Sequence, residues 1–211
     1  RWQEPVPPLP WDDPIETGRL VPRTGYLRIR GWLNTPAWRD AFEGALRDVA
    51  SYERLVVDLR GNVGGALVAA QDARSRFLPG RTELGSIQFS TVTGAMDRPH
   101  ALVAEPPAEG PLWTKPVRFL VDPLCYSATE DFLQGLQGLP HVQLVGQRTG
   151  GGSGRPRTIA LREHRIATNS TALTFDRSGR CIEGIGFEPD IAIHADPLRP
   201  DATLDAALTG W

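Results

Sequence analysis

The chain has 211 residues and a formal net charge of −2, because 23 lysines and arginines stand against 25 aspartates and glutamates. This balance offers no electrostatic attraction for nucleic acid or for an anionic membrane surface. The length and the 40% hydrophobic content suffice for one sizeable core, and no run approaches the roughly 18 apolar residues of a membrane span, so we expect one domain and no membrane-spanning helix.

The chain opens with a proline-rich stretch. Residues 1–24 contain six prolines and almost no apolar periodicity, which favours an extended, semi-rigid tether or linker. We therefore place the domain at residues 25–211. It begins with a strand, GYLRIR, and a helix from Thr35, where Pro36 suits the first helical position and apolar residues recur at helical spacing.

Two segments then repeat a strand, a turn and a helix. In residues 55–78 the apolar run LVVDL is followed by the glycine turn RGNVGG and a helical stripe. In residues 117–136 the run VRFLVD is followed by the turn PLCY and a second stripe, and residues 142–146 return as a strand. This alternation predicts α/β architecture with parallel strands.

The remaining segments are less regular. Residues 81–116 contain a strand candidate at residues 86–93 and a long proline-rich loop, and short strands such as RTIALR and DIAI follow Gly146. The predicted fold class is therefore α/β, with β-turn-α units in the core and a β-rich C-terminal part.

Two loops follow parallel strands and are candidates for a ligand site, because ligands of open α/β sheets bind at the carboxyl edge. Ser127 stands at a strand-to-helix junction, a favourable place for a nucleophile, and Gly64 and Gly65 allow the backbone to approach a ligand closely. Each loop taken alone has a simpler interpretation. Ser127-Ala128-Thr129-Glu130 fits a capping box, and RGNVGG fits a plain turn.

Nucleotide and metal chemistry find little support. The glycine segments lack the lysine of a phosphate-binding loop, and the four histidines are scattered without a metal-binding spacing. We expect no cofactor and no metal.

Taken in order, five motifs resemble peptidase family S41, the C-terminal processing or tail-specific peptidases. They are TGYLRIRGW, DLRGNVGG, SATE, VGQRTGG and GFEPDI, and they extend from Gly25 to about residue 193. The resemblance implies a ClpP/crotonase-like core. It also implies that Ser127 is the catalytic nucleophile, and that the Ala128 N–H and an N–H of the turn at Gly64 and Gly65 form the oxyanion hole.

One position departs from the Ser-Lys peptidases of the family. Their lysine lies in a T-x-G-K-G segment, which here reads Thr149-Gly150-Gly151-Gly152. The only lysine, Lys115, precedes the strand that leads to Ser127, so about six residues at roughly 3.3 Å each place it near the opposite end. A Ser-Lys dyad is therefore excluded.

What remains is similar to the tricorn-like and retinoid-binding-protein-like branch, in which serine works with histidine and glutamate. The resemblance implies that Glu183 is the catalytic carboxylate and that the histidine lies upstream of Arg1. None of the histidines present is a convincing replacement for the catalytic histidine. His141 lies at the far end of the helix that starts at Ser127, and only His100, in the long loop, is not excluded by geometry.

The sequence thus predicts the core of a serine endopeptidase that acts on peptides or unfolded polypeptides by acyl transfer and is incomplete without upstream segments, among them a PDZ-like segment. The alternative is a catalytically silent module that binds an extended peptide or an apolar ligand. The resemblance favours an exported, periplasmic or extracellular protein.

The two cysteines each stand two residues before a proposed site residue, at positions 125 and 181. If Ser127 and Glu183 converge, the cysteines converge as well and a disulfide becomes feasible. Two separate thiols are the alternative.

Overall fold

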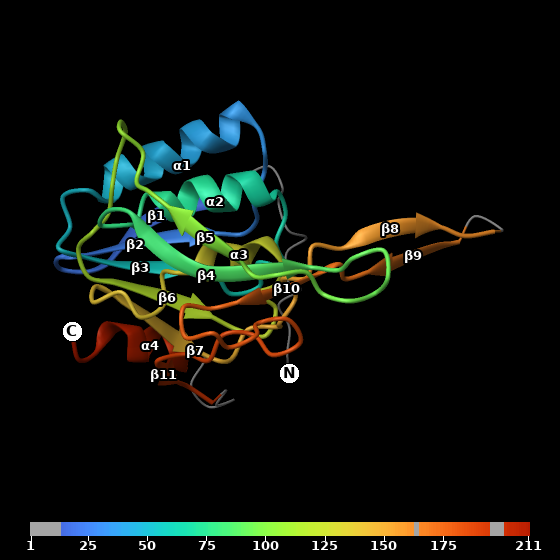
Figure 1. Ribbon diagram of the computed structural model, residues 1–211. Helices are drawn as coiled ribbons and strands as arrows, with labels where there is room; N and C mark the ends of the chain where they lie inside the picture. The colour runs from blue at the N-terminus through green and yellow to red at the C-terminus, as the bar shows by residue number, and fades with distance from the viewer. Residues whose placement is uncertain (1–13, 163–164, 195–200) are drawn as a thin grey trace.

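A computed structural model of the protein describes residues 14–162, 165–194 and 201–211. Its centre is a six-stranded sheet with the order β1-β2-β3-β6-β7-β11 (Figure 1). β1 pairs antiparallel with β2, and every other neighbouring pair is parallel. The strands are β1 (Ile15–Val21), β2 (Thr24–Ile29), β3 (Arg54–Asp58), β6 (Val117–Val121), β7 (Val142–Gly146) and β11 (Ile191–Ala192).

Helices cover both faces of this sheet (Figure 1). Three of them pack into the larger core on one face, and α4 packs on the other. The alternation along β3 explains the two cores, since Leu55 and Val57 face the larger one and Val56 the smaller. The helices are α1 (Pro36–Val49), α2 (Leu67–Ser75), α3 (Ala128–Leu133) and α4 (Ala202–Leu208).

Helix α1 begins where the sequence predicts. The hydroxyl of Thr35 accepts the Trp38 N–H at 3.2 Å, and Pro36 occupies the first turn, where its missing N–H leaves no bond unmade. The buried face includes Phe42 and Leu46.

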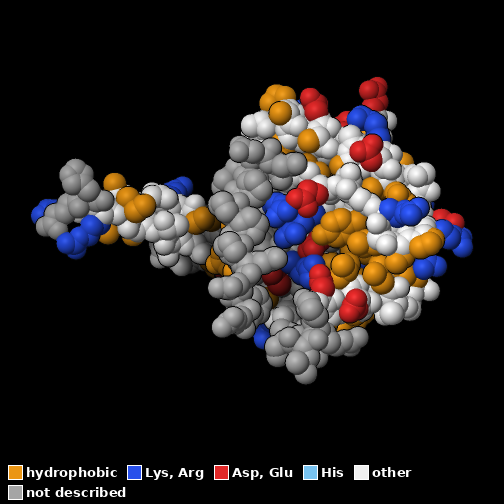
Figure 2. All heavy atoms as spheres, turned by 180° about the vertical axis from the view of Figure 1, so that it is seen from behind, with side chains coloured by type: hydrophobic (Ala, Val, Ile, Leu, Met, Phe, Trp, Pro, Cys, Tyr) orange, Lys and Arg blue, Asp and Glu red, His pale blue; other side chains and the backbone are white. Residues whose placement is uncertain are grey.

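Two smaller sheets accompany the core. One is antiparallel with the order β10-β4-β5, formed by β4 (Thr82–Phe89), β5 (His100–Ala104) and β10 (Ala172–Phe175). The other is the hairpin of β8 (Arg157–Ala160) and β9 (Ile166–Asn169), which projects from the body of the molecule (Figures 1 and 2). The α/β class and the mostly parallel sheet confirm the predicted fold class.

The predicted boundary at residue 25 is wrong for the last part of the proline-rich stretch. Residues 15–21 form β1, which pairs with β2 along most of its length. An edge strand of this kind is held by backbone hydrogen bonds and has only Ile15 buried, so it leaves no apolar periodicity in the sequence. Residues 1–13 of the proposed tether lie outside the described residues.

Two further elements were not predicted. β5 lies inside the segment interpreted as a long loop, where its side chains are only partly buried, and α4 lies in the tail. Asp201 caps the start of α4, because its carboxylate accepts the Leu204 N–H at 3.0 Å. None of the helices in the described part of the chain is long and apolar enough to span a bilayer.

Candidate active site

The loops that follow β3 and β6 are tied together at the carboxyl edge of the sheet. The carboxylate of Asp122 accepts the Gly61 N–H at 3.1 Å from each oxygen, and within its own loop it accepts the Cys125 N–H at 3.1 Å. A second link joins the Tyr126 N–H to the Asn62 carbonyl at 3.2 Å. The two loops therefore meet, as expected from their positions after parallel strands.

Gly64 lies directly against Ser127. A Cβ at Gly64 would stand 2.9 Å from the Ser127 Cβ and 3.1 Å from the Ala128 nitrogen, and Gly64 has a φ of +112°. Both the contact and the dihedral angle require glycine here. The glycine turn is thus part of the same site as the serine.

Ser127 is held in an unfavourable backbone conformation. Its φ of 56° and ψ of −122° are rare for a residue with a side chain, and such a conformation costs about 1–3 kcal/mol that the surrounding structure must supply. Its hydroxyl makes no capping hydrogen bond to α3 and the residue is partly exposed. The structure therefore does not support Ser127 as the hydroxyl cap of this helix.

The backbone donors around Ser127 differ in what they bind. The Gly64 N–H donates to the Asn62 side-chain oxygen at 3.0 Å. The N–H groups of Gly65 and Ala128 have no acceptor among the described residues. Within the described part of the chain, two of the three amides proposed from the sequence therefore have no acceptor and can bind an external oxygen.

These groups line one pocket of about 330 Å³. Ser127, Gly65 and Ala128 belong to its lining, together with charged and polar residues that no sequence motif indicates. The lining includes Gly65, Ser127, Ala128, Asp131, Ser153 and Arg155.

Glu130 ties α3, the helix that follows Ser127, to the glycine-rich loop. Its fully buried carboxylate accepts the Thr149 hydroxyl at 2.6 Å and the N–H groups of Gly151 and Gly152 at 2.8 and 2.5 Å. Burial raises the pKa of Glu130, and these donors oppose the rise. The sequence places Glu130 in a motif but does not reveal its partners, because they lie about twenty residues further along the chain.

Glu183 lies beside Gly154, next to the loop that lines the pocket. One carboxylate oxygen accepts the Ser170 hydroxyl at 2.6 Å, and the other is buried without a hydrogen-bond partner among the described residues. A Cβ at Gly154 would stand 2.4 Å from Glu183 Oε1. Glu183 itself is not part of the pocket lining.

The described histidines lie away from Ser127 or are already bound. His100 contacts the Asp97 carboxylate at 2.8 Å, and His141 contacts the Phe77 carbonyl at 3.0 Å. Neither lines the Ser127 pocket. His164 lies outside the described residues.

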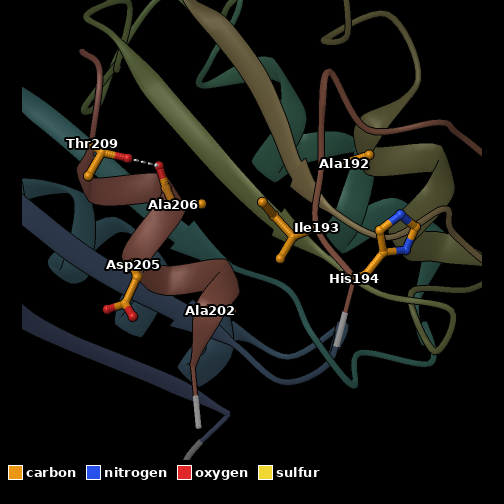
Figure 3. A pocket seen from close by; sticks show the side chains of 7 residues that line it. All are labelled: Ala192, Ile193, His194, Ala202, Asp205, Ala206 and Thr209. Carbon is orange, nitrogen blue, oxygen red and sulfur yellow. Dashed lines mark hydrogen bonds between the residues drawn. The ribbon is translucent and has the colours of Figure 1, made fainter. Parts of the chain in front are cut away.

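His194 lines a different pocket, of about 390 Å³, between α4 and the segment that follows β11 (Figure 3). That pocket contains no serine. In the portion of the chain with described placement, no three histidine, cysteine or acidic side chains are arranged to hold a metal ion.

Lys115 lies before the start of β6, at the end of the strand opposite to Ser127, and its ammonium is already hydrogen-bonded. Its ammonium donates to the carbonyls of Ala50, at 2.7 Å, and Tyr52, and it lies 4.5 Å from the centre of the Trp113 ring. The predicted exclusion of Lys115 from the Ser127 end of the strand is confirmed.

Both cysteines are free thiols in this structure. Cys125 is buried and donates to the Leu59 carbonyl at 3.1 Å, whereas Cys181 is partly exposed. The alternative of two separate thiols therefore holds here.

A parallel sheet whose carboxyl edge presents a strained serine beside free backbone amides is the arrangement expected of a hydrolase that attacks carbonyl groups. The sequence model of Peptidase family S41 matches residues 23–193. The chain belongs to this family.

Two relatives and one further structure illustrate the similarity. A carboxy-terminal-processing protease of Bartonella bacilliformis is 29% identical over 175 residues, which are 80% of this chain and 38% of that protein. A putative peptidase from Parabacteroides merdae has a TM-score of 0.83 and 26% identity over 92% of this chain and 63% of its own. The photosystem II D1 C-terminal processing protease, at 21% identity, covers 86% of this chain and 48% of its own with a TM-score of 0.66, which shows the shared fold. The chain thus spans less than two thirds of each.

Proposed function

We propose that this chain is the catalytic core of a serine endopeptidase that cleaves peptides or unfolded polypeptides by acyl transfer through Ser127. The observation that carries the proposal is the pocket in which a strained, partly exposed serine adjoins two backbone amides that have no acceptor among the described residues. Membership of Peptidase family S41 supports the same chemistry.

The first step follows from the position of these groups. Ser127 Oγ attacks the carbonyl carbon of the peptide bond, and the N–H groups of Gly65 and Ala128 bind the oxygen as it becomes negative. Gly64 allows the turn to approach the serine, while its own N–H is used by Asn62. The C–N bond then breaks as the amine takes up a proton, and water hydrolyses the acyl-serine.

The proton of Ser127 needs a base. No described histidine or lysine lines the pocket, and the hydroxyl makes no hydrogen bond to a described residue. We infer that a histidine outside these 211 residues is the base, as in the tricorn-like branch, and that Glu183 orients it. The buried, unpartnered oxygen of Glu183 supports this role, because it is an acceptor ready for an imidazole N–H.

The setting of the complete protein is part of this proposal. We place it in the periplasm or outside the cell and assign it a PDZ-like segment, both on the family resemblance. Family membership and the strained serine favour the peptidase over the catalytically silent binding module.

Labelling with a fluorophosphonate probe tests the proposal in the complete protein that contains the missing base. The probe is expected to label Ser127 and to block peptide hydrolysis, and Ser127→Ala is expected to lower kcat/KM by about 10⁴ or more. Glu183→Gln is expected to lower it less, because an orienting carboxylate contributes less than the nucleophile. A complete protein that neither reacts with the probe nor cleaves peptides would instead be the binding module.

A further inference from the structure

The Ser127 pocket contains a pair of charged side chains that acyl transfer does not need. Asp131, four residues after the serine on α3, is 2% exposed and binds both terminal nitrogens of Arg155 at 2.5 and 2.6 Å. Both residues line the pocket. A planar two-point contact of this kind fixes the guanidinium in orientation as well as in place.

The backbone of Arg155 is also unusual. Among the described residues with side chains, only three have positive φ, and two of them, Ser127 at 56° and Arg155 at 49°, line this pocket. Residues held in such conformations cluster at functional sites.

Arg155 retains donors after binding Asp131. The two contacts use one N–H of each terminal nitrogen, and the Nε–H has no acceptor among the described residues. A guanidinium has five N–H donors, so three stay available.

A second group in the pocket lacks a partner. Ser153 is 3% exposed and lines the pocket, and its hydroxyl is buried without a hydrogen bond to any described residue. A buried hydroxyl without a protein partner can hydrogen-bond to a water molecule or to a ligand atom.

A second guanidinium lies next to the Asp131–Arg155 pair. Arg74, which is 5% exposed, donates to the Asp131 carbonyl at 2.8 Å, so two cations flank the single Asp131 carboxylate. Burial lowers the pKa of Arg74 to about 10, and Asp131 opposes this, which leaves Arg74 charged at neutral pH. Two further carboxyl groups lie near this pair: that of Glu130 accepts three hydrogen bonds, and that of Glu183 contacts Ser170 and is not part of the pocket lining.

We propose that Arg155, oriented by Asp131 and assisted by the Ser153 hydroxyl, forms a subsite that binds a carboxylate of the substrate beside the scissile bond. The inference rests on the proposed peptidase function and specifies its substrates as peptides with a carboxylate near the cleaved bond. That carboxylate belongs to an aspartate or glutamate side chain or to the C-terminus of the peptide.

Binding can be measured without catalysis. The Ser127→Ala variant of the 211-residue chain is titrated with fluorescent peptides that differ in one group: aspartate against asparagine in amidated peptides, and a free against an amidated C-terminus in peptides without acidic residues. We expect at least one carboxylate peptide to bind about tenfold more tightly than its amide partner. Discrimination in the first pair identifies the side chain as the source, and discrimination in the second identifies the C-terminus.

The matched variant is the double substitution Asp131→Asn and Arg155→Gln. It removes both charges together, because removing Arg155 alone would leave Asp131 buried and unpaired. The discrimination is expected to fall to near unity in the double variant and to weaken in Ser153→Ala. It is expected to persist in Arg157→Gln, which removes an exposed arginine of β8.

Equal binding of all acid and amide partners, or discrimination that survives the double variant, overturns the carboxylate subsite. If acid and amide peptides are discriminated but Ser127 of the complete protein does not react with the probe, the carboxylate subsite is supported and the peptidase function is contradicted. The two proposals therefore fail separately.

Discussion

The ring of Tyr126 occupies the space into which a side chain at Gly152 would extend. A Cβ built on Gly152 would stand 1.9 Å from the ring carbon Cζ of Tyr126. The resemblance to the T-x-G-K-G segment of the Ser-Lys peptidases implies that Gly152 takes the position of their lysine, and Tyr126 fills the space in which a side chain at Gly152 would begin. The structure thus gives a steric reason for glycine at position 152.

The first prediction compares Gly150 and Gly152, which both lie against the Tyr126 ring. Gly152→Ala is expected to destabilise the fold by about 1 kcal/mol, because the tip of Tyr126 must move aside. Tyr126→Ala should remove this cost. Gly150→Ala should stay costly in either background, since its Cβ would also stand 2.8 Å from the Pro123 carbonyl. Urea unfolding of the single and double variants measures the coupling, and additive Tyr126 and Gly152 effects would contradict the contact.

The second prediction concerns Gly64, with Gly61 as its matched control. Both have positive φ, but a Cβ at Gly61 would meet nothing within 4 Å, whereas one at Gly64 would press on Ser127. Gly61→Ala is expected to cost about 1 kcal/mol through its backbone and to leave probe labelling of Ser127 in the complete protein intact. Gly64→Ala should cost more and suppress labelling. Similar labelling of the two variants would show that the turn does not shape the site.

The third prediction uses the buried carboxyl of Glu130. Burial raises its pKa above the ordinary value of 4.5, so the folded state binds the proton more tightly than the unfolded state. The stability that this contributes is complete at pH values below 4.5 and is lost as the pH rises through the folded-state pKa.

Relative to Glu130→Gln, the wild-type chain is therefore expected to lose free energy of unfolding as the pH rises above 4.5. Thr149→Val is the control, because it removes one donor to Glu130 but keeps the titrating carboxyl, and the loss of stability with pH should persist. Denaturant unfolding at a series of pH values measures both slopes, and parallel curves for wild type and Glu130→Gln would refute the raised pKa.

The fourth prediction concerns the thiols. Burial, and to a smaller extent the negative charge of Asp122, raise the pKa of Cys125. Little of the reactive thiolate is therefore present in the folded protein. A thiol reagent is expected to modify the partly exposed Cys181 first and Cys125 only on unfolding. In the denatured, unreduced chain both thiols should react with the reagent. If no thiol reacts, the two cysteines form a disulfide.

The sequence by itself determined the elements whose signals are local. The cap at Thr35 with Pro36 specifies the start of α1, and the apolar runs of β3 and β6 predict buried parallel strands, because these features act within one or two turns of the chain. Parallel strands place their following loops at one edge, so the meeting of Ser127 with the Gly64 turn could also be predicted.

Tertiary structure decided what depends on partners distant in the chain. Asp131 and Arg155 are 24 residues apart, and nothing in the local sequence around either residue predicts that they pair. The choice of Gly65 over Gly64 as a free donor depends on the Asn62 side chain, and the backbone strain at Ser127 exists only because the packed loops impose it. Local sequence fixes which backbone states are accessible, whereas hydrogen-bond partners and strained conformations are set by the packing of the whole fold.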